Sequence, residues 1–477
     1  MRLSRFTVLS DAEIRAIHEA SLGILETCGV KVLDRAALAR LGEKGLEVEA
    51  ERAIVRFSRA AVEDAIARAP RTFEVFDRDG RLAFVLGDGA PRVAAGHNSV
   101  FWVDSDTGRT RPATVADVER FSAISEHLPG IDMVGVPAMP QDVLDPRSSV
   151  LHGLRAVIEN SRKPVYFSTD NARANRACIE LVRAAFPGDI RERVYGVSQL
   201  SPTSPLFWEE GVAQALLDTL DTGVPIAILP EPIAGFTAPY ALAALLTMNN
   251  AECLSGIAMA EILRPGAKIL YANSWTTFDM RSAAALVGSV ETSVCRIAGA
   301  QLARFYGIPC HTTAPNSDNH AHDEQNAWEK TLSQLCAIAA GNDLIVNCGM
   351  FATGMTSSDE QLLMDEEITE LARRLVRGVE VTEEAIAADL IRRIGPQGRD
   401  YLTEEHTVRR LRSDEFFHPR LSVRGPRAAW EAAGAKDTYQ IAREKAREYA
   451  RRPRAVPPAA VREKLAEIAA SFSKEAE

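Results

Sequence analysis

Apolar segments recur along the chain at a regular spacing from residue 131 onward. They are short and rich in branched side chains, and between them apolar residues recur every three to four positions. The short segments predict strands near residues 131–136, 164–168, 194–199, 224–229, 267–272, 308–312 and 343–348. The stretches between them predict helices near residues 147–162, 171–186, 208–222, 238–263, 282–306 and 323–340. Such alternation is typical of a parallel sheet covered by helices.

A closed barrel explains this alternation better than an open nucleotide-binding sheet. No Gly-x-Gly-x-x-Gly turn follows a predicted strand, and the chain has no Gly-Lys-Ser/Thr phosphate loop. We therefore predict an α/β fold, a TIM-type (β/α)8 barrel. Seven of its strands are evident, and the eighth is expected either within residues 82–103 or after Arg377.

The segments that flank the alternating region have different patterns. Residues 1–120 combine helices, the first preceded by the capping-box pair Ser10 and Glu13, with short β-like pieces. They predict a mixed α+β cap. Residues 121–400 form the predicted barrel domain, and residues 401–477 form a predicted helical extension packed on it.

Composition narrows the class of protein. The chain is 46% hydrophobic and 25% charged, as in soluble globular proteins, and its net charge of −10 argues against nucleic-acid or membrane partners. Seven scattered cysteines are typical of reduced thiols. No apolar run is long enough for a membrane span, so a cytoplasmic protein is expected.

The loops that follow barrel strands are the expected location of the chemistry. Glu231 follows one predicted strand, and aromatic residues lie on this loop and its neighbours. These aromatic residues are Phe207, Trp208, Phe236, Tyr240 and Trp275. Aromatic faces with few cations among them predict a pocket for a quaternary ammonium, which cannot donate a hydrogen bond. The alternative is that these rings only fill the top of the barrel.

Residues 316–324 are the densest polar stretch of the chain. They include Asn316, Asp318 and His320, which could act as a general acid, bind a carboxylate or coordinate a metal. His-x-His alone is weak evidence for zinc, and we expect no metal site. The alternative is that Asp323 and Glu324 favour the start of the following helix. Glu252 and Glu291 are interpreted as structural carboxylates.

A set of motifs in one order spans most of the chain. They are DSDTGRTRPAT at 104–114, SPL at 204–206, PIAGFTAP at 232–239, NAE at 250–252, PG at 265–266, YGIP at 306–309, DEQ at 323–325 with Glu329, and GPQG at 395–398 with His406 and Thr407. This order resembles the trimethylamine methyltransferase family, the corrinoid-dependent methyltransferases. The resemblance implies a barrel that accepts a methylated amine and docks a separate corrinoid (cobalamin) protein, with no cofactor bound directly.

The chain departs from the founding members of that family in one respect. They carry pyrrolysine, which the resemblance places roughly within residues 310–325, and this chain has standard residues there. Members without pyrrolysine resemble glycine betaine and other quaternary-amine methyltransferases. We therefore expect methyl transfer from a quaternary, or tertiary, amine such as glycine betaine to the cobalt(I) of a corrinoid protein.

Roles for individual residues follow from these expectations. The five aromatic residues named above are expected around the ammonium. His311 or His320 is expected to hold a substrate carboxylate, and Asn316, Asp318 and Glu231 are expected to shape the catalytic site. Two alternatives stay open: a zinc-dependent methyltransferase that uses Cys348 and the histidines of 311–322, and a betaine-binding protein without catalysis. A homo-oligomer is expected.

Overall fold

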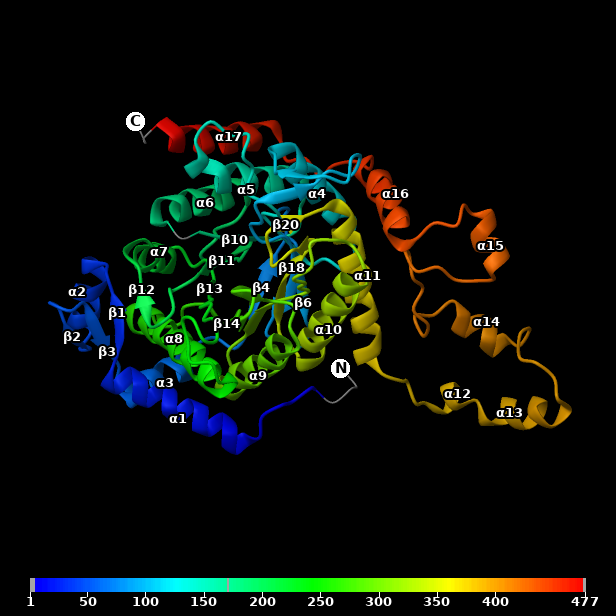
Figure 1. Ribbon diagram of the computed structural model, residues 1–477, viewed down its shortest axis with the longest axis horizontal. Helices are drawn as coiled ribbons and strands as arrows, with labels where there is room; N and C mark the ends of the chain where they lie inside the picture. Colours follow the sequence, from blue (N-terminus) through cyan, green and yellow to red (C-terminus); the bar gives the residue numbers. More distant parts are fainter. Residues whose placement is uncertain (1–4, 170, 475–477) are drawn as a thin grey trace.

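Eight parallel strands close into a barrel in the computed structural model, which describes residues 5–169 and 171–474 (Figure 1). The strands follow one another in chain order around the barrel. They are β6 (Arg92–Ala95), β9 (Met133–Gly135), β10 (Val165–Ser168), β11 (Gly196–Leu200), β13 (Ile226–Ile228), β14 (Ile269–Asn273), β17 (Cys310–Thr313) and β18 (Leu344–Cys348). The predicted (β/α)8 barrel is thereby confirmed, with a strand at each of the seven predicted positions.

The eighth strand is β6, which lies within the first of the two segments proposed for it. It pairs with β18 on one side, where Arg92 faces Leu344, and with β9 on the other, where Ala94 faces Met133. The barrel therefore takes a strand from residues 1–120, the segment predicted as the cap, and begins before residue 121. Val93 and Ala95 of this strand are fully buried, which fits its place in the closed sheet.

A helix follows each strand and covers the outside of the barrel. These helices are α4 (Val115–Glu126), α5 (Ser149–Asn160), α6 (Ala172–Ala185), α7 (Glu210–Leu220), α8 (Leu242–Leu263), α9 (Val290–Tyr306), α10 (Glu324–Ala340) and α11 (Asp359–Arg377). The helix predicted over residues 282–306 begins later than expected, because residues 282–289 are not helical. β15 (Thr277–Asp279) and β16 (Ala284–Leu286) form an antiparallel hairpin, and Ser289 caps α9 only after it.

The barrel interior is filled at the amino ends of its strands. The hairpin of β4 (Phe73–Phe76) and β5 (Leu82–Leu86) contributes Phe73, Val75 and Leu86 to the same buried cluster as Leu270 and Val346 of the barrel strands. Val75 bridges to Val194, immediately before β11. Because this end is plugged, the open space of the barrel lies at the carboxyl ends of the strands.

Two small sheets flank the barrel. The first has the order β12-β1-β3-β2. It joins β12 (Phe207–Trp208) to three strands from the start of the chain, β1 (Val30–Val32), β2 (Glu47–Glu49) and β3 (Ile54–Arg56). The same part of the chain contains the helices α1 (Asp11–Thr27), α2 (Arg35–Glu43) and α3 (Arg59–Arg68). The predicted capping box of Ser10 and Glu13 is present at α1. The other has the order β19-β20-β7-β8, from β7 (Phe101–Val103), β8 (Thr110–Pro112), β19 (Met350–Phe351) and β20 (Thr356–Ser357).

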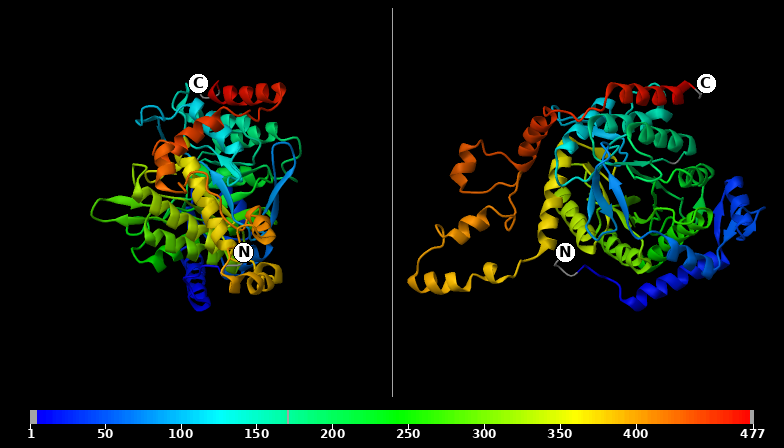
Figure 2. Two further views of the ribbon diagram at one scale, coloured as in Figure 1. Left: turned by 90° about the vertical axis from the view of Figure 1, so that its right-hand side faces the viewer. Right: turned by 180° about the vertical axis from the view of Figure 1, so that it is seen from behind.

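The C-terminal part divides into a packed portion and a projecting one (Figure 2). α16 (Thr438–Ala450) packs on α4 and α11, and α17 (Ala459–Lys474) packs on α5 and α6. Between α11 and α16 the chain projects from the barrel with α12 (Glu383–Ile386), α13 (Ala388–Ile394), α14 (Glu405–Leu411) and α15 (Arg427–Ala432). The prediction that all of 401–477 packs on the barrel is thus wrong for this portion, because α14 and α15 bury no residue. Among the described residues, no helix has both the length and the apolar character of a membrane span.

Candidate active site

A cavity of about 780 Å³ opens at the carboxyl end of the barrel. All eight strands contribute to its wall, either directly or through the segments that follow them. Phe472 of α17 completes one side, although it lies more than a hundred residues beyond the last barrel strand. A cavity of this size and place suits a small molecule held by a few polar groups.

Three hydrogen-bonded side chains cross the barrel beneath the cavity. Tyr166 on β10 donates its hydroxyl proton to Gln199 Oε1, and the same hydroxyl oxygen lies 2.9 Å from Nε2 of His311 on β17. Because the proton is used on Gln199, His311 must donate Nε2–H to Tyr166. His311 Nδ1 is then a buried acceptor with no hydrogen-bond partner among the described residues.

A second set of side chains continues this network to the other side of the cavity. His97, two residues beyond β6, has its Nδ1 3.0 Å from Oδ1 of Asn347. Asn347 donates Nδ2–H to Oδ1 of Asn316 at 2.9 Å, and Asn316 donates to the carbonyl of Thr313 at 3.1 Å. Gln199 also hydrogen-bonds His97, so one network runs from Asn316 to His311.

Burial keeps this network uncharged. It lowers the pKa of His97 to about 4, although the hydrogen bonds of His97 to Asn347 and Gln199 oppose the shift, and it lowers the pKa of His311 to about 3. Burial also raises the pKa of Tyr166 well above its ordinary value. Both imidazoles and the phenol are therefore neutral near pH 7.

Asn347 has a backbone conformation that is uncommon for its residue type. Its φ is 105°, and the register between β18 and β6 shifts between Val346 and Cys348. Non-glycine residues rarely adopt positive φ, and bulges redirect side chains beside functional sites. Here the bulge brings one amide within reach of both His97 and Asn316.

Glu231 is the one acidic side chain among the described residues that line the cavity. It follows β13 between Pro230 and Pro232, and its side chain faces the open space. The surrounding protein desolvates the carboxylate and raises its pKa, while a hydrogen bond from Ser274 acts in the opposite direction. The described part of the wall thus combines one carboxylate with a neutral hydrogen-bonded network and, on the segments after β9 and β10, with Arg147 and Arg173.

A buried ion pair joins the loop that carries Asn316 to the segment that follows Asn347. Lys330 on α10 donates to Asp365 on α11 at 2.8 Å, and to the carbonyls of Pro315 and Met350. Both charged side chains are fully buried. Asp365 also accepts Gly349 N–H at 2.7 Å, so the pair joins the segments after β17 and β18.

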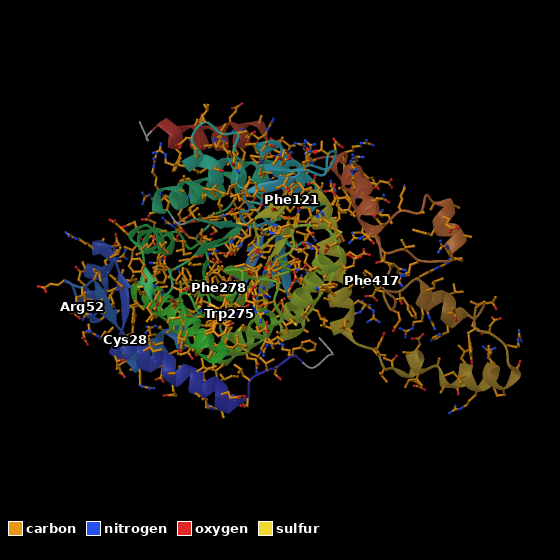
Figure 3. All side chains as sticks on the ribbon, viewed as in Figure 1. Cys28, Arg52, Phe121, Trp275, Phe278 and Phe417 are labelled. Carbon is orange, nitrogen blue, oxygen red and sulfur yellow. The ribbon has the colours of Figure 1, made fainter. Side chains whose placement is uncertain are left out.

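The predicted aromatic enclosure is not formed. Trp208 and Trp275 are each 1% exposed and lie between the barrel and its helices. Trp208 donates to Ser255 of α8 at 3.1 Å, and the Trp275 ring, labelled in Figure 3, contacts Gly299 of α9. Large rings are needed there to fill the space between the two layers.

The other three aromatic residues also lie outside the cavity wall. Phe236 and Tyr240 are 73% and 62% exposed, and Phe236 stacks on Phe278 with ring centroids 6.1 Å apart. Phe207 is half-buried on β12, where the ammonium of Lys31 lies 5.8 Å from its ring. Their assignment to substrate binding is therefore corrected.

The predicted polar residues differ in whether they line the cavity. Glu231 and Asn316 line the cavity, and His311 lies just beneath it. Asp318 does not line it: its carboxylate accepts the N–H groups of Val287 and Gly288 at 2.8 and 3.0 Å, and so positions the wall residue Val287.

The remaining residues of the polar stretch 316–324 lie outside the cavity, and one of them caps the following helix, α10. His320 is exposed and outside the cavity lining, so its catalytic assignment is also corrected. Asp323 caps α10 by accepting N–H groups of Gln325 and Asn326, which confirms the alternative interpretation of this stretch. The zinc alternative requires at least three His, Cys, Asp or Glu side chains that are placed to hold a metal ion. Within residues 5–169 and 171–474, no such group is found.

Several residues of the wall and of the network beneath it are missing from the sequence-based expectations. His97 lies in a loop that could be identified only once β6 was known to be a barrel strand. Tyr166 and Gln199 lie within apolar strand patterns, where alternation alone does not distinguish the barrel interior from the helix-facing side.

A closed (β/α)8 barrel with a polar cavity at the carboxyl end of its strands defines a barrel enzyme. A profile of trimethylamine methyltransferase (MTTB) matches residues 1–475. The chain therefore belongs to the trimethylamine methyltransferase family and is a methyltransferase.

Named relatives agree with this placement. Trimethylamine methyltransferase MttB of Desulfitobacterium hafniense is 31% identical over 439 residues, covering 92% of this chain and 88% of that protein. Glycine betaine methyltransferase of Desulfitobacterium hafniense strain Y51 is 30% identical over 436 residues, covering 90% and 89%. The crystal structure of Methanosarcina barkeri monomethylamine methyltransferase shares the fold, with a TM-score of 0.52 and 12% identity over 94% of this chain and 95% of that one.

Proposed function

We propose that this chain transfers a methyl group from a quaternary or tertiary methylated amine, such as glycine betaine, to the cobalt(I) of a corrinoid carried by a separate protein. The observation that carries the proposal is Glu231, the one acidic side chain among the described residues of the cavity wall, which lies beside an uncharged hydrogen-bonded network. A quaternary ammonium has a diffuse positive charge and no N–H to donate. The negative charge of Glu231 and the uncharged network beside it match that headgroup, while the two arginines of the described wall, Arg147 and Arg173, lie on the segments after β9 and β10.

The neutral network suits a reaction without acid–base catalysis. When a methyl group leaves a quaternary ammonium, the tertiary amine that remains is neutral and needs no proton. His97 and His311, uncharged near pH 7, neither repel the cation nor donate a proton to the product. Their role in the proposal is to fix the wall against which the methylated headgroup is oriented.

Glu231 has to attract the cation without holding it too firmly. Charge on nitrogen disappears during the reaction, so a carboxylate in tight contact would stabilise the substrate more than the transition state. The hydrogen bond from Ser274 occupies part of the Glu231 carboxylate and moderates that attraction.

In the proposal, the corrinoid approaches the open side of the cavity and not its inner end. When bound, it supplies a strongly nucleophilic cobalt that accepts the methyl group. The inner end is occupied by the network of Tyr166, Gln199 and His311, while the cavity is open on the side away from the barrel. The methylated headgroup in the proposal therefore lies between the network and the approaching corrinoid.

The test mixes the purified chain with a reduced corrinoid protein and each of a panel of methylated amines, and follows the cobalt(I) absorbance. Loss of that absorbance with at least one quaternary or tertiary amine supports the proposal. Glu231→Gln should slow the reaction, whereas Glu26→Gln, the same change on the exposed face of α1, should not. Binding of betaine without methylation beside any corrinoid protein would favour the non-catalytic alternative. Methylation of a thiol that stops when zinc is chelated would favour the zinc-dependent one.

A further inference from the structure

A second cavity, of about 280 Å³, lies at the amino ends of β17 and β18. It is therefore at the opposite end of the barrel from the candidate active site. Four stretches that are distant in sequence form it: the segment before α1, the turns on both sides of the β4–β5 hairpin, the end of α9 with the turn into β17, and the turn between α10 and β18. The methyl-transfer proposal gives this cavity no role.

Three arginine side chains line the cavity. They are Arg5 before α1, Arg71 before β4 and Arg304 in the last turn of α9. Arg304 donates to the carbonyl of Ala340, whereas the side chains of Arg5 and Arg71 have no hydrogen bond or ion pair within residues 5–169 and 171–474. Burial lowers the pKa of Arg304, and the charge of Arg5 lowers it further. Three cations thus gather around one hollow and repel one another unless an anion joins them.

The acidic groups of this region offset only part of that charge. Asp343 is the one carboxylate among the described residues that line the cavity. Burial raises its pKa to about 6, although the charges of Arg5 and Arg304 oppose the shift. Asp88, which also lies nearby, is paired with Arg92 at 2.6 Å. The cavity is therefore positive on a chain whose net charge is −10, and it attracts anions that the rest of the molecule repels.

Two glycines allow the arginines to lie flat against the cavity wall. Gly341 and Gly307 end α10 and α9 in the left-handed region, with φ of 79° and 68°. A Cβ on Gly341 would lie 2.9 Å from Nε of Arg5, and one on Gly307 would lie 3.3 Å from Cζ of Arg71. Helix C-termini attract cations, which explains why arginines lie here. It does not explain why Arg5 and Arg71 donate to no carbonyl of the described chain.

We propose that this cavity binds the phosphate group of a small molecule or inorganic phosphate itself. Each guanidinium can donate two parallel hydrogen bonds to phosphate oxygens. A bound phosphate joins the segment before α1, the β4–β5 hairpin and α9, because each supplies one arginine. The strands that begin here, β17 and β18, carry His311 and Asn347, so the anion also stabilises the base of the candidate active site. This proposal is independent of the substrate and of methyl transfer.

The experiment titrates the full-length chain with inorganic phosphate and with pyrophosphate in a calorimeter, with the ionic strength held constant by potassium chloride. Saturable binding of at least one probe is expected, and the midpoint of thermal unfolding should rise with the concentration of that probe. Tighter binding of pyrophosphate would assign the site to a larger phosphorylated molecule, and tighter binding of phosphate to the free ion. Saturable binding of neither probe would overturn the proposal.

Two variants with opposite expected effects test the assigned residues. Arg5→Gln combined with Arg71→Gln should raise the dissociation constant of the bound probe about 10-fold or more, since charge-assisted hydrogen bonds are lost. Asp343→Asn should lower it about threefold or more, since a repelling carboxylate is removed, and partial unfolding would not produce tighter binding. The matched control is Arg399→Gln, on an exposed residue outside the cavity, which should bind as wild type does. An unchanged affinity in the double arginine variant, with unchanged circular dichroism, would overturn the proposal.

Discussion

The rings of Tyr166 and His311 stack across the interior of the barrel, with centroids 5.4 Å apart and planes 8° apart. They come from β10 and β17, which lie four strands apart in the ring of eight and therefore on opposite sides. Their hydrogen bond thus spans the barrel and forms the inner end of the cavity. Several measurable properties depend on this contact and on the groups around it.

Tyr166→Phe removes the hydroxyl that joins Gln199 and His311. Both partners are buried, so their unpaired groups should lower the free energy of unfolding by about 1–3 kcal/mol, as measured by urea denaturation. The control is Tyr240→Phe on the exposed loop after β13, for which we expect a change of less than about 0.5 kcal/mol. Equal stability of the Tyr166 variant and wild type would show that the network is not maintained in solution.

Glu231→Gln removes the one carboxylate that the described residues contribute to the cavity wall. Affinity for a quaternary amine, measured by calorimetry without any corrinoid protein, should fall roughly 10- to 100-fold, because one desolvated charge–charge attraction is lost. Glu26→Gln should bind as wild type does. An unchanged affinity in the Glu231 variant would place the ammonium elsewhere.

Binding of a quaternary amine should weaken as the pH falls. Burial raises the pKa of Glu231, and the carboxylate loses its charge as the pH falls through that raised value. The quaternary nitrogen does not titrate, and His97 and His311, with pKa values of about 4 and 3, stay neutral between pH 5 and 8. The pH dependence should therefore disappear in Glu231→Gln, and calorimetry at several pH values checks this. A slope that persists in the variant would assign it to another group.

Lys330→Met leaves Asp365 buried without its cation. Removing one partner of a buried ion pair costs about 3–5 kcal/mol of unfolding free energy. The segments after β17 and β18 should also loosen, which hydrogen exchange at Gly349 would detect, because the Gly349 N–H donates to Asp365. Lys44→Met, at the exposed end of α2, is the matched control. A loss of stability no larger than that of the control would contradict the role assigned to the pair.

Glu252 should make stability depend on pH. Burial raises its pKa from 4.5 to about 7, although Ser204 and the Leu206 N–H both donate to it at 2.8 Å. The folded state then binds this proton more tightly than the unfolded state, so the contribution of Glu252 to stability is largest below pH 4.5 and is lost as the pH rises through about 7. The loss is roughly 3 kcal/mol. Urea denaturation between pH 4.5 and 8 should show this component in wild type and not in Glu252→Gln.

The barrel could be predicted from the sequence because its strands are buried on both sides. Segments such as 224–229 and 344–346 are continuous apolar runs, and such runs are visible without knowledge of their neighbours. β6 was harder to identify, since Arg92–Ala95 is short and lies among glycine-rich hairpins. Its burial comes from β18, some 250 residues away along the chain.

The candidate site was predicted only in part, because the sequence places a residue on a loop or strand but does not give the direction of its side chain. The order of strands and loops places Glu231 and Asn316 at the mouth of the barrel, and both line the cavity. The orientation of an aromatic ring cannot be derived from its position in a loop, so Trp208 and Trp275 were assigned to the cavity although they pack behind the barrel wall. Tyr166 was missed because a polar group within an apolar strand resembles ordinary core.

The pairing of β6 with β18 has a consequence for synthesis on the ribosome. β6 is made early, but its partner on one side emerges only when residues 344–348 have been translated. Until then the nascent sheet has a free edge at β6, which neighbouring polypeptides can join. We expect newly made chains to require chaperone protection during that interval, and overexpression to favour insoluble product over closed barrels.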